Sequence, residues 1–400
     1  MTLAFGLCGC GGMGRRHIHG MTKLKAVGRM PFDLVAVCDV LPANTDLAAN
    51  LAHERLGRRP DIYARVEDLP SLDGLIVTTS PETHAAVGLA ALDKGMHLLV
   101  EKPVTLTVAQ GRELVAGAQA AGRRLAVAEN YRRDPINRLA KALIDAGALG
   151  RPYLYIQSAS SNGERMIITP WRHLKRKGGI IVDMGIHYAD LLEYFLGPVA
   201  SVMGMNAVVD QQRIDSLGNR HPADAEDLSV GVARYADGAL AHWLLNEAGR
   251  GERLFQRIVH GTGGSLTIPR DRSGQKLLLS QRRPRPNAVG QDEIVPDDAL
   301  LDLVPDFALD DVTAALFGGE RLTSYDMVFA DIDANLLGIE QHDLATAIET
   351  GREPEVTGAF GLRTLALVLG FLESDMLGRP VTLDEVLTRT DLPYQAQIET

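Results

Sequence analysis

Short apolar runs alternate with longer amphipathic segments through the first third of the chain. The apolar runs have the length of buried strands, and they lie at residues 3–7, 33–38, 73–79, 97–100 and 124–128. The segments between them have helical length, and they include residues 15–24, 46–56 and 108–121. Strands that alternate with helices favour a parallel sheet covered by helices. We therefore expect an α/β fold, with a Rossmann domain over residues 1–128.

The pattern changes after residue 128. One helix is expected within residues 129–150, and β-like runs follow at 153–159, 199–209, 228–235, 239–245, 254–260 and 265–268. Asp237-Gly238 between two of these runs is a strong hairpin signal. Many strands in series, followed by long helical patterns at 326–349 and 359–377, predict an α+β domain over residues 129–400. Residues 270–298 are expected to form mobile loops around one short strand.

A glycine-rich turn follows the first predicted strand. Gly9, Gly11 and Gly14 form a G-x-G-x-x-G pattern, with Gly12 and Met13 inside it, directly before a helical segment. The first glycine makes a tight bend, the second lets a pyrophosphate approach the backbone, and the third lets helix and strand pack closely. The start of the helix then offers free N–H groups to the phosphates. These five residues are predicted to bind a dinucleotide, and the alternative is a glycine-rich turn without a ligand.

Asp39 ends the second predicted strand. A carboxylate at this position typically accepts a hydrogen bond from the 2′-hydroxyl of the adenosine ribose. Its charge would repel a 2′-phosphate, and residues 40–43 contain no Arg or Lys that would bind one. The sequence therefore favours NAD over NADP as the cofactor.

Further candidate cofactor contacts follow two later strands, because open parallel sheets bind ligands at the carboxyl ends of their strands. Ser80 is expected to cap the next helix, and His84 either faces the nicotinamide or simply caps this helix. Glu101 and Lys102 end the following strand, and Pro103 after them invites a cis peptide bond. Lys102 at this place can contact both cofactor and substrate, or it is a solvated loop residue.

One helix is predicted between Gly178-Gly179 and Gly197-Pro198. Asp183 and His187 lie four residues apart on it, so their side chains share one face. A carboxylate and an imidazole at this spacing can work as an oriented acid–base pair. The alternative is a half-buried helix on which the two residues fall in register by coincidence.

The segment before this helix, residues 160–177, is basic in a chain whose net charge is −10. Trp171 lies among its basic side chains, which are Arg165, Arg172, His173, Lys175, Arg176 and Lys177. A solvated loop or a subunit contact would explain them. The other hypothesis is an anionic sugar, a uronate, sulfonate or phosphate, that a guanidinium binds near the reacting ring.

Composition argues against several other classes of protein. The negative net charge is unfavourable for binding nucleic acid or an anionic membrane surface. No apolar run is long enough to span a bilayer, and the N-terminus lacks the pattern of a secretory signal. The three cysteines have no zinc-like spacing, so we expect no metal site, and they fit a reducing cytoplasm.

Taken together, five motifs resemble the Gfo/Idh/MocA family, named for glucose–fructose oxidoreductase and inositol dehydrogenase. They are the glycine turn with Asp39, Thr79-Ser80-Pro81 with His84, Glu101-Lys102-Pro103, Glu129-Asn130-Tyr131-Arg132 with Pro135, and Gly178-Gly179 leading to Asp183, His187 and Asp190. The resemblance implies a second domain with a large, mostly antiparallel open sheet, helices on one face and often a partner subunit on the other. It implies a homodimer or homotetramer, and that Lys102, Asp183 and His187 match the family's catalytic trio.

The resulting hypothesis is NAD-dependent hydride transfer from a ring hydroxyl of a sugar, glycoside or cyclitol. His187 is predicted to be the general base, Asp183 to orient it or hold a neighbouring hydroxyl, and Lys102 to stabilise developing alkoxide charge. Tyr131, Arg132, Trp171 and Arg172 are candidates for the wall of the substrate site, beside Asp183 and His187.

Two other hypotheses remain open at the level of sequence. An NAD-dependent glycoside hydrolase would use the same fold for transient oxidation, elimination, hydration and re-reduction, with Tyr131 as an extra base. A non-catalytic, NAD-binding regulatory protein is the third possibility, and the presence of Lys102, Asp183 and His187 speaks against it.

Overall fold

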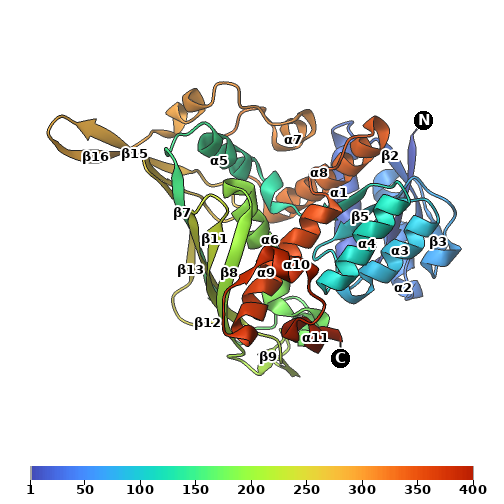
Figure 1. The fold of residues 1–400 in the computed structure, drawn as a ribbon. Coiled ribbons are helices and arrows are strands. Elements are labelled where there is room, and N and C mark those ends of the chain that lie inside the picture. Colours follow the sequence, from blue (N-terminus) through green and yellow to red (C-terminus); the bar gives the residue numbers. More distant parts are fainter. Residues whose placement is uncertain (1, 400) are drawn as a thin grey trace. The chain divides into compact units, whose positions relative to one another are not determined.

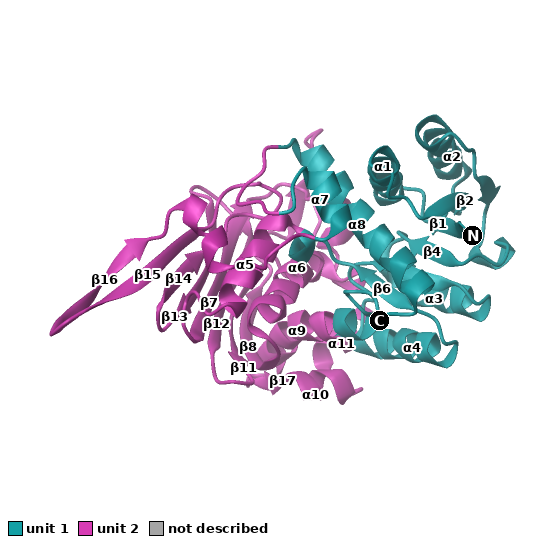
Figure 2. Cartoon of the chain, turned by 90° about the horizontal axis from the view of Figure 1, so that it is seen from above, with its two compact units in different colours: residues 1–133, 310–320, 327–362 teal, residues 134–309, 321–326, 363–400 magenta. Residues whose placement is uncertain are grey.

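The computed structural model describes residues 2–399, and the chain forms two compact units, which Figure 2 colours separately. Unit 1 contains residues 1–133, 310–320 and 327–362, and unit 2 contains residues 134–309, 321–326 and 363–400. Unit 1 therefore includes two C-terminal segments that lie beyond the predicted boundary at residue 128. A hydrophobic pattern shows that a distant helix has a buried face, but it does not show which of two cores that face joins.

Unit 1 is built on a six-stranded parallel sheet in the order β3-β2-β1-β4-β5-β6. Its strands are β1 (Leu3–Cys8), β2 (Phe32–Cys38), β3 (Asp61–Tyr63), β4 (Gly74–Val77), β5 (His97–Glu101) and β6 (Leu125–Ala128). Its helices are α1 (Gly12–Ala26), α2 (Pro42–Leu56), α3 (His84–Asp93), α4 (Val108–Ala120), α7 (Asp311–Phe317) and α8 (Phe329–Thr350), seen in Figure 1. The strand order changes direction between β1 and β4, where such sheets bind nucleotides. The predicted Rossmann fold is confirmed.

Helix α8 joins the core of unit 1 by packing against α1. A Cβ on Gly20 would lie 2.9 Å from the backbone nitrogen of Gly338, so the two helix backbones approach each other closely. The Arg16 Nε donates to Asp333 at 2.7 Å, which ties the first turns of the two helices together. These contacts explain why a segment more than 300 residues away in sequence belongs to this unit.

Unit 2 is built on a nine-stranded sheet in the order β16-β15-β14-β13-β7-β12-β11-β8-β17. Its strands are β7 (Pro152–Asn162), β8 (Val199–Ala207), β11 (Leu228–Tyr235), β12 (Leu240–Gly249), β13 (Leu254–Gly261), β14 (Gly264–Thr267), β15 (Leu278–Arg285), β16 (Ala288–Ile294) and β17 (Val381–Thr382). The pair β7–β12 is parallel, and the other neighbours in this sheet are antiparallel. A separate hairpin pairs β9 (Gln212–Ile214) with β10 (Arg220–Pro222). The helices are α5 (Pro135–Asp145), α6 (Gly179–Leu196), α9 (Gly358–Leu377, in this unit from residue 363), α10 (Leu383–Thr388) and α11 (Pro393–Glu399).

Helices α6 and α9 cover one face of this large sheet (Figure 1). The buried Trp243 of β12 stacks on Phe371 of α9 with 4.8 Å between the ring centroids. On β8, a Cβ on Gly204 would lie 2.5 Å from the Phe371 carbonyl oxygen, so this glycine lets the helix approach the sheet. The other face carries exposed apolar side chains such as Met205 and Val232, which are 67% and 55% exposed. The predicted large, mostly antiparallel sheet with helices on one face is thus confirmed.

The structure corrects the prediction for residues 270–298, where mobile loops and one short strand were expected. Strands β15 and β16 form a hairpin that extends the large sheet (Figure 1). Asn287 turns the chain with a positive φ of 58°, and Arg282 pairs with Asp292 across the two strands. Cross-strand charge pairs and a left-handed turn residue stabilise a hairpin without the apolar alternation on which the prediction relied.

Within residues 2–399, none of the helices is long and apolar enough to cross a membrane. The same residues contain no group of three or more His, Cys, Asp or Glu side chains arranged to hold a metal ion.

Candidate functional site

The glycine-rich turn connects β1 to α1 in unit 1. Gly11 is the N-cap of α1, and the half-buried Met13 lies in the first turn of this helix. A Cβ on Gly14 would lie 2.0 Å from the carbonyl oxygen of Gly9, which itself has a positive φ of 97°. A Cβ on Gly11 or Gly12, in contrast, would meet no atom within 4 Å. The turn is therefore tightly packed at both ends and open in the middle, which fits a pyrophosphate at the helix N-terminus.

Asp39 lies just beyond the end of β2, and its carboxylate is tied to the glycine-rich turn. The Cys10 N–H donates to Asp39 Oδ2 at 2.7 Å, and the Leu41 N–H donates to Oδ1 at 2.9 Å. Two oxygens have about four acceptor positions, so the carboxylate can still accept from a ribose hydroxyl. The geometry fits NAD, because a 2′-phosphate would meet this negative charge.

Glu101 and Lys102 lie at the end of β5, as predicted, and the Lys102–Pro103 peptide bond is cis. The Glu101 carboxylate, only 7% exposed, lies 3.0 Å from Nε2 of the buried His17 and accepts the Lys102 N–H at 3.1 Å. Burial alone would raise the pKa of Glu101, but the His17 hydrogen bond and the Lys102 and Arg16 charges lower it below the usual range. The carboxylate of Glu101, which was predicted to contact the cofactor, therefore lies against His17 in the structure.

His84 and Ser80 follow β4. Both ring nitrogens of the buried His84 face carbonyl oxygens, with Nδ1 2.9 Å from the Pro103 oxygen and Nε2 3.1 Å from the Thr79 oxygen. Burial lowers the pKa of His84, although its contacts with the two carbonyl oxygens act in the opposite direction, and the imidazole connects the segments after β4 and β5. Ser80 is the N-cap of a 3₁₀ turn, Pro81–Thr83, that precedes α3, but its side chain makes no cap hydrogen bond. Thr83 Oγ1 instead donates to the Ser80 carbonyl oxygen.

Tyr131 and Arg132 follow β6 in unit 1 and are 4% and 6% exposed. The Tyr131 N–H donates to Glu129 Oε1 at 3.0 Å, and the Arg132 guanidinium lies 4.3 Å from the ring centroid of Phe360. Packing holds both side chains, so only a small part of each is exposed to a ligand.

Helix α6 carries the predicted acid–base pair in unit 2. It begins after Gly178, which has a positive φ of 98°, and it packs on β12, where a Cβ on Gly185 would lie 3.3 Å from the Trp243 ring. Asp183 and His187 lie one turn apart and are 4% and 7% exposed. Both polar groups are therefore held on a rigid helix, which restricts the directions in which they can act.

The basic segment before α6 holds Asp183 from the side. The Arg172 Nε donates to Asp183 Oδ2 at 2.8 Å, its Nη1 donates to Thr169 Oγ1 at 2.7 Å, and its guanidinium lies 4.4 Å from the Trp171 ring centroid. Farther along, the Lys175 Nζ pairs with Glu226 at 2.6 Å. Two cations of this segment are therefore engaged in structural ion pairs.

Comparisons with known proteins agree with this geometry. Residues 3–129 match an oxidoreductase family with an NAD-binding Rossmann fold, and residues 137–267 match the GFO/IDH/MocA C-terminal domain. The chain belongs to the Gfo/Idh/MocA oxidoreductase family. As a member of this family, it is an oxidoreductase that uses NAD.

Curated relatives in the family match the chain along most of its length. The D-apiose dehydrogenase of Paraburkholderia graminis is 27% identical over 94% of this chain and 88% of its own. The scyllo-inositol 2-dehydrogenase (NAD(+)) of Bacillus subtilis is 25% identical over 88% of this chain and 89% of its own. A structure of levoglucosan dehydrogenase with NADH has the same fold, with a TM-score of 0.75 and 20% identity over 96% of this chain and 99% of that one.

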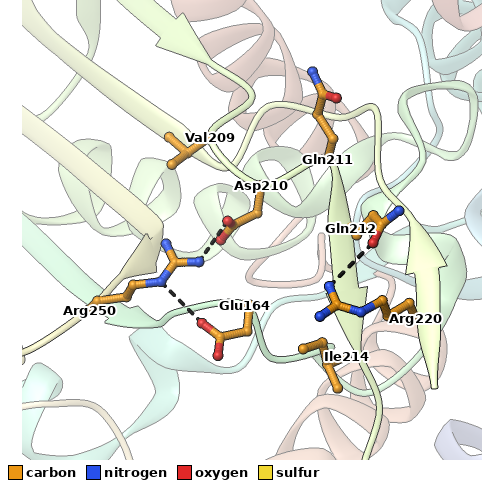
Figure 3. Close-up of a pocket in the computed structure, with 8 residues that line it drawn as sticks. All are labelled: Glu164, Val209, Asp210, Gln211, Gln212, Ile214, Arg220 and Arg250. Atoms are coloured by element: carbon orange, nitrogen blue, oxygen red, sulfur yellow. Dashed lines mark hydrogen bonds and ion pairs between the residues drawn. The ribbon is translucent and has the colours of Figure 1, made fainter. Parts of the chain in front are cut away.

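A polar pocket of about 650 Å³ lies in unit 2 of this Gfo/Idh/MocA protein, beside the β9–β10 hairpin (Figure 3). Arg250 bridges its walls by donating to Asp210 at 2.7 Å and to Glu164 at 3.1 Å. None of the eight lining residues is a predicted site residue. Because the charged residues that line the pocket pair with one another, we interpret it as a surface depression and do not assign the reaction to it.

His17 is the functional candidate that the sequence reasoning missed. It lies on α1, three residues after Gly14, and its partners Glu101 and Gln341 are distant in sequence. Its position in the first turns of the helix after the glycine-rich turn was the available signal. Glu101 on β5 and Gln341 on α8 can be identified as its partners only in the folded structure.

Proposed function

We propose that the protein oxidises a ring hydroxyl of a sugar, glycoside or cyclitol in an NAD-dependent reaction. Bound NAD supplies the hydride acceptor. The observation that carries the proposal is the buried Asp183–His187 pair on α6, with Asp183 anchored by Arg172. The related D-apiose and scyllo-inositol dehydrogenases support this class of substrate.

In this proposal, the protein's own residues move the hydroxyl proton and stabilise the charge that it leaves. His187 accepts the proton as general base. Asp183, held by Arg172, orients the imidazole or binds a neighbouring hydroxyl. Lys102 donates to the same oxygen and stabilises its developing negative charge. Tyr131, Arg132, Trp171 and Arg172 contribute to the wall of the substrate site.

A neutral substrate fits the basic segment better than an anionic one. Arg172 already pairs with Asp183, and Lys175 already pairs with Glu226, so an anionic substrate would have to compete with a carboxylate for each cation. Comparing kcat/KM for a neutral sugar and the matching uronic acid tests this point. A clear preference for the acid would restore the anionic-sugar hypothesis.

A panel of sugars, cyclitols and aryl glycosides, incubated with NAD, tests the proposed function. We expect NADH to accumulate in step with an oxidised sugar or cyclitol. Free sugar and aglycone without net NADH would instead identify a hydrolase, and no turnover on any member of the panel would favour a non-catalytic protein.

We further propose that the protein is a cytoplasmic homo-oligomer that pairs through the open face of the large sheet. Met205 lies opposite Val230 and Met203 opposite Val232 on that face, and all four side chains are at least 36% exposed. A contiguous apolar patch of this kind favours an isologous contact. Light scattering should give the mass of a dimer or tetramer, and Val232→Lys should reduce it.

A further inference from the structure

Two buried carboxyl groups of unit 1, Glu101 and Glu340, have different surroundings. Glu101 accepts two hydrogen bonds, whereas neither oxygen of Glu340 has a hydrogen-bond partner among residues 2–399. Burial, together with the negative charge of Glu101, holds the pKa of Glu340 well above its usual range. Glu340 is therefore a neutral acid, and Glu101 is the ionised member of the two.

The partners of His17 fix its protonation state. Gln341 Nε2 lies 2.9 Å from the His17 carbonyl oxygen and 2.9 Å from its Nδ1. The carbonyl oxygen can only accept, so the amide group of Gln341 must donate at this place, and Nδ1 accepts. The fully buried imidazole is then neutral with its proton on Nε2, which donates to Glu101 Oε1 at 3.0 Å.

The second oxygen of Glu101 accepts the backbone N–H of Lys102 at 3.1 Å. One carboxylate therefore joins a core imidazole on α1 to the peptide that carries the lysine. The charges of Lys102 itself and Arg16 are among the influences that lower the pKa of this carboxylate, so its negative charge is matched within the same cluster.

We propose that His17 and Glu101 form a buried positioning pair for Lys102. This role rests on the catalytic function proposed above for Lys102. The pair fixes the peptide from which the Lys102 side chain projects, and it keeps a negative charge on the adjacent residue. Hydrogen-bonded supports of this kind hold a functional group in its productive geometry.

A double-mutant cycle on kcat tests the proposal. Glu101→Gln should lower kcat about tenfold in the native background and should change it little in a Lys102→Met background, because coupled residues are non-additive. The dissociation constant of NAD, measured by fluorescence, should change less than about threefold. His17→Gln retains a donor near Nε2 and should keep a higher kcat than His17→Met, which has none.

Glu340→Gln is the matched control. It replaces a buried neutral acid with an isosteric amide in the same unit, so kcat should stay within about twofold of the native value. A measurement without turnover is the ¹⁵N spectrum of histidine-labelled protein. It should show the His17 signals, identified by their loss in His17→Gln, as the neutral tautomer with the proton on Nε2.

The outcomes separate this proposal from the function on which it rests. Near-normal kcat in Lys102→Met would overturn the catalytic role of Lys102 and the positioning role with it. A large loss in Lys102→Met with native kcat in Glu101→Gln would overturn the positioning pair alone. Equal effects of Glu101→Gln in both backgrounds, or a His17 proton on Nδ1, would do the same.

Discussion

Two buried carboxylates accompany the predicted catalytic residues, and they are held in different ways. Glu101 of unit 1, next to Lys102, is fixed by the imidazole of His17, which is 0% exposed. Asp183 of unit 2, one turn from His187, is fixed by Arg172, whose side chain is 18% exposed and comes from the segment before α6. One support belongs to a packed core and the other to a surface segment.

This difference suggests a division of labour within the proposed mechanism. A carboxylate held by core elements keeps its geometry whether or not a ligand is bound. A carboxylate held by an arginine of a surface segment can exchange that partner for a substrate hydroxyl more readily than one held within the core, because the Arg172 side chain is 18% exposed and water screens its charge in part. We infer that the Lys102 side is preorganised and that the Asp183 side adapts to the substrate.

The largest expected effect comes from replacing Lys102 or His187, the proposed catalytic residues near these two carboxylates. Lys102→Met and His187→Ala should each lower kcat by about a hundredfold or more, because each removes a group that is proposed to act on the reacting hydroxyl. Steady-state kinetics and NAD binding measure the effect, and NAD binding should stay nearly native. Near-normal turnover in either variant would refute that residue's role.

Stability should distinguish the two supports. His17→Met leaves the buried Glu101 carboxylate without the hydrogen bond from the imidazole and should lower the free energy of unfolding by about 3 kcal/mol. Arg172→Met removes a pair in which only the arginine is partly exposed, and it should lower the free energy of unfolding by a smaller amount, about 1–2 kcal/mol. Urea unfolding followed by circular dichroism compares them, and an equal loss in both variants would remove the distinction between core and surface support.

The kinetics of Arg172 variants should show whether the surroundings of Asp183 adapt to the substrate. Arg172→Met should lower kcat/KM for the best sugar by about tenfold, because Asp183 loses a charge-assisted hydrogen bond. Arg172→Lys keeps the charge but not the planar donor geometry, so its kcat/KM should lie between those of the native protein and Arg172→Met. If Arg172→Met has native kcat/KM, the ion pair is structural only.

A pH dependence of stability is also expected within the segment that supports Asp183. His173 accepts the Ile167 N–H at its Nε2, and burial, with the charges of Arg213 and Arg172, lowers its pKa to about 4. The unfolded state binds the proton near pH 6.5, so the free energy of unfolding should fall as the pH drops from about 6.5 to 4. Thermal melts of His173→Gln should show a flatter slope over this range, and an unchanged slope would exclude His173 as its source.

The sequence predicted most of unit 1 because its signals are local. The glycine-rich turn, Asp39 and the end of β5 follow one another along the chain, and each requires only its neighbours to be recognised. The helical register of Asp183 and His187 is likewise a property of one segment.

Features that depend on distant partners were not predicted. For the segment that contains Arg172, the sequence left a solvated loop, a subunit contact and an anionic-sugar site open, and it did not predict that Arg172 pairs with Asp183 eleven residues later. Helix α8 carries an apolar face that fits either core, and its contacts with α1, such as the Gly20–Gly338 approach and the Arg16–Asp333 pair, assign it to unit 1. A sequence pattern indicates which positions are buried and how they are spaced, but it does not indicate which residue each of them contacts.

The central claim is that hydride leaves a ring carbon of a sugar or cyclitol. The most direct measurement uses the best substrate of the panel, deuterated at its ring carbons, and determines the mass of the cofactor after turnover. We expect one deuterium in the NADH that forms. Substrate consumption without deuterium in the cofactor would contradict it.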